Sequence, residues 1–451
     1  MTQHLTPTAP HDLIGIGFGP SNLALAIALQ ERAEQGGKAF DALFLERQSD
    51  YNWHGNTLVA QSELQISFLK DLVTLRNPSS RFSFVNYLKV HGRLVDFINL
   101  GSFYPCRMEY NDYLRWVAMQ FAEQSRYGEQ VLRVEPVVEA GGRVRHLNVI
   151  SQNLHGREVS RQARSVIVST GGTPKVPQAF AGFKDDPRVF HHGRYLSAMA
   201  TQPCTRGEPM RIAVVGAGQS AAEAFIDLND SYPNVQVDII LRAGVLKPAD
   251  DSPFVNEIFG PDYTDLVFNQ PETERERLIR EYHNTNYSVV DLSLIQRIYG
   301  ILYRQKVSGI NRHGFLCRRM IESASEVDGR VQLQLRDLGT GSTEARCYDA
   351  VILATGYERR SHRELLAPLK DYLDDFRVDR DYQLLARPEL ETPVFIQGFS
   401  QQSHGLSDTL LSVLPARSGE IAAALEKRLE GIRQPQSAPE ARRAAGLSVS
   451  A

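Results

Sequence analysis

Two glycine-rich segments have the residue spacing that binds the phosphates of a dinucleotide. The first, GIGFGP at residues 15–20, follows a short apolar run, and the second, GAGQSA at residues 216–221, follows the apolar run at 211–215. In such a turn the first glycine lets the chain reverse tightly and the second lets the backbone approach a pyrophosphate. The helix that follows presents free N–H groups to the anion. Pro20 replaces the usual third glycine, and proline suits a first helical position. The sequence therefore predicts two dinucleotide sites.

The residue that ends the strand after each glycine turn distinguishes the two nucleotides. The apolar strand at 42–45 ends in Glu46, an acid that pairs with the hydroxyls of a ribose. The strand at 235–241 ends instead in Arg242, whose charge suits the 2′-phosphate of NADPH. A solvated cation at a strand end is the alternative interpretation of Arg242. We expect FAD at the first site and NADPH at the second.

The overall composition is that of an average multidomain globular protein. The length of 451 residues exceeds a single core and indicates two or three domains, and 42% hydrophobic with 23% charged residues excludes fibrous and disordered classes. The net charge of −3 comes without a basic run, so no nucleic-acid partner is expected. The four cysteines form no C-x-x-C pair, which argues against a redox dithiol or a zinc site and fits a reducing cytoplasm.

Two further apolar strands indicate how the domains are connected. The segments at 165–172 and 349–357 both contain Thr-Gly at their ends, the second in the A-T-G form common in flavoproteins with two dinucleotide sites. We interpret both strands as returns to the first domain. This predicts an α/β fold of two Rossmann-like domains, with a discontinuous FAD domain at 10–205 and 348–432 and an NADPH domain inserted at 206–347. Residues 250–305 lack strand alternation and predict a small helical subdomain, a candidate substrate lid.

The remaining segments are expected to be unstructured or unrelated to chemistry. Residues 1–9 and 433–451 predict disordered tails. The apolar segment at 13–29 resembles a signal peptide or membrane anchor, but it has no preceding Lys or Arg and contains three glycines, so we interpret it as strand, turn and helix. No transmembrane segment is expected. No metal site is expected either, because the adjacent His191 and His192 would point to opposite faces of a strand.

Longer motifs resemble a known family. They are NWH at 52–54, LQISFLKDL at 64–72, KPADDSPFVN at 247–256, HNTNYS at 283–288 and HGLSDTLLS at 404–412. Together they resemble the microbial L-ornithine N5-monooxygenases, most closely the bacterial enzymes of pyoverdine siderophore synthesis, over about residues 11–430. The resemblance implies that NADPH reduces FAD, that O₂ adds to give a C4a-hydroperoxyflavin, and that the amine of ornithine attacks its distal oxygen while NADP⁺ stays bound. Because the amine must be neutral, a partly desolvated pocket without a carboxylate beside Nδ is expected.

The resemblance also assigns residues to each ligand. No side chain is expected to act as a catalytic acid or base, because the flavin supplies the reactive oxygen. Lys70 matches the lysine that pairs with the substrate α-carboxylate. Asn256, Asn286 and Ser412 match further substrate contacts. The residues that match FAD contacts are Gly15, Gly17, Gly19, Pro20, Glu46, Trp53, His54, Gln65, Val131, Thr409, Leu410 and Leu411. The residues that match NADPH contacts are Gly216, Gly218, Gln219, Ser220, Arg242, Asn286, Tyr287 and Ser288. A helix starting near Asp408 is expected to point N–H groups at the reduced flavin.

Three other functions fit parts of the same pattern. Lysine N6-hydroxylases share the plan and differ by one methylene of pocket depth. A general flavin-containing or Baeyer–Villiger monooxygenase would use a histidine linker, which FHHGRY at 190–195 matches loosely. A redox sensor without turnover would need both nucleotides but not Lys70, Asn256 or Asn286. Oligomeric state, association with other siderophore-synthesis enzymes and peripheral contact with the inner membrane are left open by the sequence.

Overall fold

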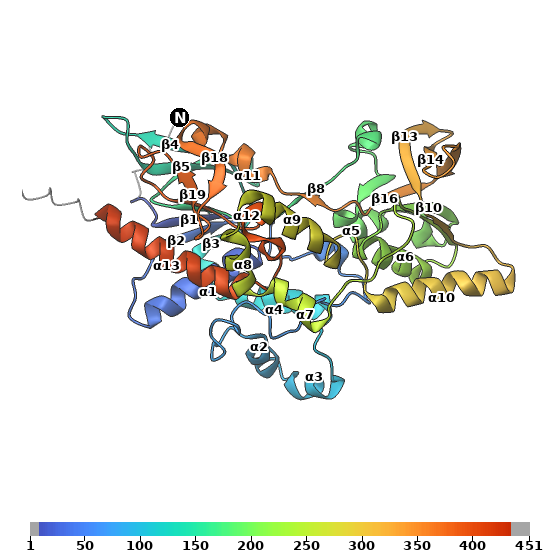
Figure 1. The fold of residues 1–451 in the computed structure, drawn as a ribbon, viewed down its shortest axis with the longest axis horizontal. Helices are drawn as coiled ribbons and strands as arrows, with labels where there is room; N and C mark the ends of the chain where they lie inside the picture. The colour runs from blue at the N-terminus through green and yellow to red at the C-terminus, as the bar shows by residue number, and fades with distance from the viewer. Residues whose placement is uncertain (1–8, 434–451) are drawn as a thin grey trace, which may run out of the picture.

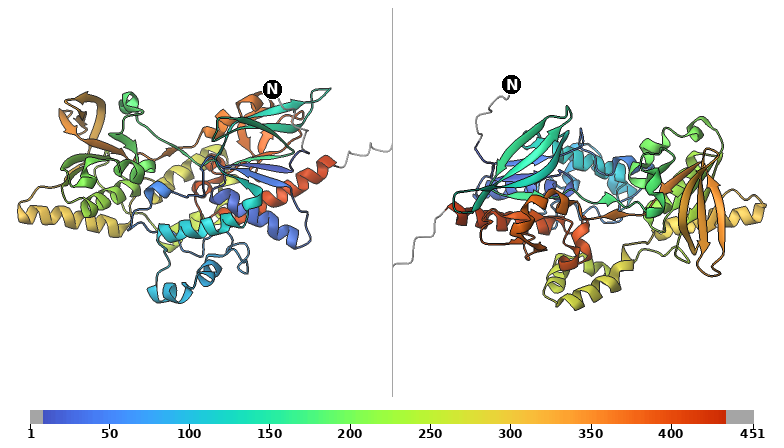
Figure 2. Two further views of the ribbon diagram at one scale, coloured as in Figure 1. Left: turned by 180° about the vertical axis from the view of Figure 1, so that it is seen from behind. Right: turned by 90° about the horizontal axis from the view of Figure 1, so that it is seen from above.

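The computed structural model describes residues 9–433 and contains two separate units side by side along its longest axis (Figures 1 and 2). A parallel sheet of order β20-β7-β1-β2-β3 forms the centre of the first unit. Its strands are Leu13–Ile16 (β1), Ala42–Leu45 (β2), Ser125–Arg126 (β3), Val166–Val168 (β7) and Val394–Ile396 (β20). β1, β2, β7 and β20 are buried at every residue, because both faces of the sheet are covered. The predicted strand at 42–45 is confirmed.

One face of this sheet is covered by helices and the other by a three-stranded antiparallel sheet. α1 (Pro20–Glu34) packs against α4 (Arg107–Met119) and α13 (Leu414–Arg433). Residues 22–29 of α1 are all buried, as expected for a helix that is apolar on every side. Pro20 is its first helical residue, as the sequence predicts. On the other face, Ile14 and Leu43 pack against β4 (Glu129–Val138) and β5 (Val144–Asn153), which form an antiparallel sheet with β6 (Glu158–Ala163).

The second unit is built on a parallel sheet of order β12-β11-β10-β16-β9. Its strands are Val189–His191 (β9), Met210–Val215 (β10), Val235–Ile240 (β11), Gly314–Leu316 (β12) and Ala350–Leu353 (β16). α6 (Gln219–Ser231) follows β10 and packs on the sheet together with α10 (Leu292–Ser308). Both glycine segments therefore lie between a buried parallel strand and a helix, as predicted.

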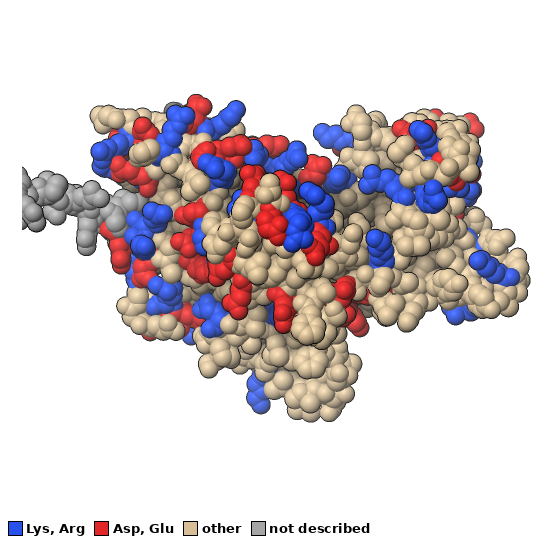
Figure 3. Space-filling model, in the orientation of Figure 1, with Lys and Arg blue, Asp and Glu red and all other residues tan. Residues whose placement is uncertain are grey.

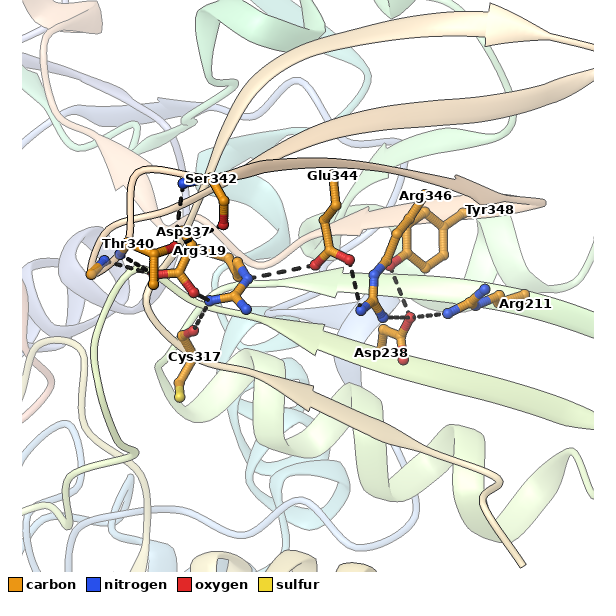
Figure 4. A network of polar contacts seen from close by, with 11 residues as sticks. Arg211, Asp238, Cys317, Arg319, Asp337, Thr340, Ser342, Glu344, Arg346 and Tyr348 are labelled. Carbon is orange, nitrogen blue, oxygen red and sulfur yellow. Dashed lines mark hydrogen bonds and ion pairs between the residues drawn. The ribbon is translucent and has the colours of Figure 1, made fainter.

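An antiparallel sheet of β13 (Arg319–Val327), β14 (Arg330–Asp337) and β15 (Thr343–Tyr348) covers the second unit, and a chain of ion pairs fastens it (Figure 4). Asp238 of β11 is nearly buried and pairs with Arg211 at 2.7 Å and with Arg346 of β15 at 3.6 Å. The Tyr348 hydroxyl donates to the same carboxylate at 2.9 Å. Because every charge has a partner, this buried carboxylate is satisfied.

One of the two strands predicted to return to the first domain lies in the sheet of the second unit. The strand at 165–172 returns to the first sheet as β7, but the strand at 349–357 does not, because β16 pairs with β10 of the second sheet. β9 also joins the second sheet, although it precedes the predicted boundary at residue 206. The two segments that follow the Thr-Gly pairs run antiparallel as β8 (Thr173–Pro174) and β17 (Tyr357–Glu358). Each of the two Thr-Gly segments thus leads the chain from one unit to the other.

The region at 250–305 is helical, as predicted, but it is divided between two neighbourhoods. α7 (Pro253–Asn256), α8 (Pro261–Phe268) and α9 (Glu272–Tyr282) precede α10. α8 and α9 contact α12 (Gln401–His404) of the first unit. α10 instead inserts Ile298 into the core of the second unit, so it is not part of a separate lid. The other elements are α2 (Phe84–Val90), α3 (Leu94–Leu100), α5 (Tyr195–Met199), α11 (Ser361–Leu365), β18 (Leu373–Val378) and β19 (Leu384–Ala386).

The surface of the described residues shows no single-sign stripe on the face of Figure 1. Acidic and basic side chains alternate there, whereas the lobe of α2 and α3 is mostly uncharged (Figure 3). Among the helices within residues 9–433, none is both long and apolar enough to cross a membrane. The predicted disordered tails lie outside the described residues, apart from Ala9 and Arg433.

Candidate cofactor and substrate sites

A cavity of about 590 Å³ runs along the carboxyl ends of the first sheet. Most of the predicted FAD contacts line it: Gly17, Gly19, Pro20, Glu46, Trp53, His54, Val131, Thr409, Leu410 and Leu411. Gly15 and Gln65 are not among the lining residues. The cavity therefore brings together segments from residue 16 to residue 417, with the glycine turn and the 409–411 turn in one space.

The glycine turn has the geometry of a phosphate cradle. Gly17 has φ of +85°, and a Cβ on it would lie 2.7 Å from the carbonyl oxygen of Ser169, so no larger residue fits without strain. Gly15 lies beneath the turn, where a Cβ would collide with the ring of Phe44. Its role in this structure is close packing. The Asn22 amide supports the turn from below by donating to the Gly17 carbonyl oxygen at 2.6 Å.

Charged groups at this turn fit an adenosine diphosphate. The Glu46 carboxylate accepts hydrogen bonds from the Phe18 and Gln48 backbone N–H groups at 2.9 Å each, which fixes it at the cavity wall. Each carboxylate oxygen retains a lone pair for a ribose hydroxyl. Gly19 provides no side-chain cap to α1, so the first N–H groups of the helix are free to bind an anion. These residues fit the adenine half of FAD.

Another part of the cavity wall carries an aromatic ring and a histidine, Trp53 and His54. The rings of Trp53 and His54 meet edge to face with centroids 4.6 Å apart. Desolvation by the surrounding protein atoms, with smaller contributions from the charges of Arg107 and Arg359, lowers the pKa of His54 to about 4. His54 is therefore a neutral imidazole at physiological pH. An aromatic ring and an uncharged imidazole provide a wall suited to a flat heterocycle.

The expected helix near Asp408 is absent from the cavity wall. Residues Leu406–Thr409 form a 3₁₀ turn, and α13 begins later, at Leu414. Asp408 is instead paired with Arg417 at 3.0 Å, and both side chains are almost fully buried. The Ser400 N–H donates to the same carboxylate at 2.7 Å, and Arg417 also donates to the Ser21 hydroxyl at 3.0 Å. This pair ties the 409–411 turn to α1 and α13.

This buried pair was not predicted from the sequence, although the sequence contains a signal for it. Leu414, Ile421 and Leu425 are buried on one face of α13, and Arg417 occupies the same helical face. An arginine at an apolar position of a helix must find a partner when it is buried. The partner itself lies nine residues away in an irregular turn and has no periodic signal.

The second glycine segment also forms a tight turn. Gly216 has φ of +150°, and a Cβ there would collide with the carbonyl oxygen of Ala354. A Cβ added to Gly218 would lie 3.8 Å from the Cα of Ser288, which places the predicted nicotinamide segment next to the turn. Arg242 is exposed, and its side chain forms no hydrogen bond or ion pair with any described residue. It is therefore available to an anion.

The predicted nicotinamide and flavin segments contact each other directly. The Tyr287 hydroxyl lies 2.6 Å from the Thr409 hydroxyl, and the Gln401 amide donates to Tyr287 at 3.4 Å. Thr409 lines the first cavity. One hydrogen bond thus joins the segment at 286–288 to the wall of the FAD cavity.

The four predicted substrate residues lie outside the walls of the first cavity. Lys70 is partly buried, burial lowers its pKa, and its side chain forms no ion pair or hydrogen bond with residues 9–433. The Asn256 amide donates to the Asp251 carbonyl oxygen at 2.9 Å, which holds it in a turn. The Ser412 hydroxyl is buried without a hydrogen-bond partner in the described part of the chain. Lys70 and Ser412 therefore have unused polar groups.

Gln65 and Gln219 share a hydrogen-bond partner at the boundary between the units. The side-chain amide of each donates to the carboxylate of Asp291. His191 was excluded as a metal ligand, and its ring instead bonds the Gly356 carbonyl oxygen at 2.9 Å and accepts the Gly193 N–H at 3.0 Å.

Comparison with known proteins reveals close relatives. Residues 9–359 match the family described as L-lysine 6-monooxygenase/L-ornithine 5-monooxygenase. The chain is 64% identical to L-ornithine N(5)-monooxygenase of Pseudomonas aeruginosa over 95% of this chain and 97% of that protein. It is 49% identical to the enzyme of the same name from Burkholderia cepacia, over 87% and 89%.

Solved structures agree with these relatives. The ornithine hydroxylase of Pseudomonas aeruginosa superposes with a TM-score of 0.90 at 62% identity, covering 93% of this chain and all of that one. An ornithine N-hydroxylase of Kutzneria, solved with reduced FAD, NADP⁺ and L-ornithine, gives a TM-score of 0.87 at 35% identity with the same coverage. The two-domain dinucleotide-binding fold is thereby shown.

Proposed function

The chain belongs to the L-lysine 6-monooxygenase/L-ornithine 5-monooxygenase family, and from this we infer that it is an L-ornithine N5-monooxygenase. It uses FAD, NADPH and O₂ to hydroxylate the side-chain amine of ornithine. The observation that carries this conclusion is the 64% identity to the Pseudomonas aeruginosa enzyme over 95% of the chain. The product is an N-hydroxylated amino acid, which suits the synthesis of a hydroxamate siderophore of the pyoverdine type.

The two cofactors supply the chemistry, since bound NADPH provides electrons and bound FAD passes them to O₂. The chain itself binds and orients the cofactors and the substrate, and it excludes water from the site. Gly17, Glu46 and the start of α1 would hold the adenosine diphosphate of FAD, while Trp53 and the 409–411 turn would line the space for its ring system. The Tyr287 to Thr409 hydrogen bond supports a nicotinamide site beside that ring system.

The substrate residues act by charge and by hydrogen bonding. Lys70 binds the α-carboxylate of ornithine, because its ammonium group is partly buried and has no anionic partner among residues 9–433. Asn256 and Asn286 hold the amino-acid head and the reacting amine, and Ser412 offers an unused buried hydroxyl. Asn286 is uncharged, so it stabilises the ammonium form less than a carboxylate would, and the amine can lose its proton before it reacts.

A direct comparison of ornithine and lysine tests the proposal. The purified holoenzyme is incubated with FAD, NADPH and either amino acid, and the hydroxylamine product is quantified. One methylene of pocket depth is worth about 1–3 kcal/mol, so we expect about 10- to 200-fold preference for ornithine in kcat/KM. Product from lysine alone would show that the substrate is lysine and that the enzyme is a lysine 6-monooxygenase of the same family. NADPH oxidation without any hydroxylamine would overturn the proposed function.

A further inference from the structure

Asp291 immediately precedes α10 but does not cap it. An aspartate at this position normally accepts a hydrogen bond from the first turn of its own helix, which stabilises the helix by about 1 kcal/mol. Here the carboxylate makes no such bond. The carboxylate instead accepts hydrogen bonds from residues outside α10.

The carboxylate of Asp291 joins the two units of the molecule. Its Oδ1 accepts from the Gln65 amide at 2.9 Å, and its Oδ2 accepts from the Gln219 amide at 2.7 Å. The backbone N–H of Asp291 donates to Oε1 of Gln219 at 2.9 Å. Gln65 belongs to the first unit, and Gln219 is the first residue of α6, directly after the second glycine turn. One aspartate thus bridges both cofactor-binding units.

The amide of Gln219 is fixed at both ends. Besides Asp291, its Nε2 donates to Oε1 of Glu223 at 3.0 Å. The carboxylate of Glu223 is buried and pairs with Arg107 of α4 at 2.8 and 2.9 Å. Oε1 and Nε2 of Gln219 are therefore both occupied, and the side chain at the start of the NADPH helix has one defined orientation.

We propose that Asp291 is a positioning residue for reduction of the flavin. This inference rests on the proposed function. The stretch from 286 to 291 contains Tyr287, which contacts the FAD cavity wall through Thr409, and Asp291, which clamps Gln219 against Gln65. This stretch therefore fixes the position of the second glycine turn and of the predicted nicotinamide segment relative to the wall of the FAD cavity. Hydride transfer requires the reacting atoms to be about 3–3.5 Å apart, and a misplacement of about 1 Å costs on the order of 100-fold in rate.

A second cross-unit contact provides the matched control. The Gln61 amide donates to Asp230 of α6 at 2.6 Å, and Arg297 of α10 pairs with the same carboxylate at 2.7 Å. This contact also joins the first unit to α6 and α10, but its carboxylate does not contact Gln219. Asp230→Ala therefore removes a similar contact between the units and leaves the contacts of Gln219 in place.

The experiment compares D291A, D291N and D230A as FAD-loaded enzymes. Flavin reduction is followed anaerobically by stopped-flow absorbance at saturating NADPH, and reduction by dithionite reports whether the flavin itself is intact. We expect D291A to lower the limiting rate constant with NADPH at least about tenfold, because both amides lose their shared charged acceptor. D291N keeps the backbone bond and one acceptor oxygen, so its loss is smaller. FAD content, dithionite reduction and D230A stay within about twofold of the wild type.

Two results would overturn the role of Asp291. One is a D291A enzyme whose rate is within about twofold of the wild type. The other is an equal loss of rate in D230A, which would show that any contact between the units has the same effect. Should D291A fail to fold, the D291N rate decides by the same criteria. A wild-type flavin that NADPH does not reduce would instead refute the proposed function, and with it this inference.

Discussion

Gly17→Ala is expected to weaken FAD binding, because the added methyl group has no room in the glycine turn. The alanine would hold φ at +85°, a left-handed conformation that costs about 1–2 kcal/mol. Its Cβ would also lie 2.7 Å from the Ser169 carbonyl oxygen and 3.3 Å from the Thr170 Cα. Relieving such an overlap by moving backbone costs about 1–3 kcal/mol. The sum is about 2–5 kcal/mol, from adding these two costs.

The cost should appear in cofactor affinity, because Ser169 and Thr170 form the cavity wall. If half of the lower figure, about 1 kcal/mol, is expressed in binding, the Kd of FAD rises about fivefold, and the full upper figure gives more than 1,000-fold. The assay titrates deflavinated protein with FAD and follows flavin fluorescence, with thermal unfolding measured in parallel.

Gly36→Ala is the control that separates the cost of the left-handed backbone from the cost of the steric overlap. Gly36 also has a positive φ, +92°, but a Cβ there meets nothing within 4 Å and the residue is exposed. It should lose about 1–2 kcal/mol of stability at unchanged FAD affinity. If Gly17→Ala binds FAD within about twofold of the wild type, the contact with Ser169 does not shape the cradle and the reasoning fails.

Three further predictions follow from the site. Arg242→Ala should raise the KM for NADPH about tenfold and leave NADH oxidation unchanged, because its exposed guanidinium has no partner in the described part of the chain; equal losses with both nucleotides would contradict a 2′-phosphate contact. Lys70→Met should raise the KM for ornithine about tenfold while FAD content stays constant, which steady-state hydroxylation measures; an unchanged KM would remove Lys70 from the substrate site. Stability should fall as pH drops from 6.5 toward 4, because burial lowers the pKa of His313, His362 and His404 to about 4 and the unfolded imidazoles bind protons first; a flat unfolding temperature over this range would contradict it.

The sequence by itself determined the local units of this protein. Each glycine turn, the strand before it and the helix after it could be predicted, because φ freedom, periodic burial and the first-turn proline at Pro20 act within about ten residues. Glu46 and Arg242 could be placed at strand ends for the same reason. The longer motifs added the family, and the identity of the relatives confirms it.

Only the tertiary structure decided which distant segments meet. β7 and β16 are both short, apolar and followed by Thr-Gly, yet one joins the first sheet and the other the second, because parallel pairing is selected by hydrogen bonding between strands far apart in the chain. The same holds for the Asp408 to Arg417 pair and for Asp291, whose partners Gln65 and Gln219 lie 226 and 72 residues away. Local pattern specifies an element, but partner choice between elements depends on the packed whole.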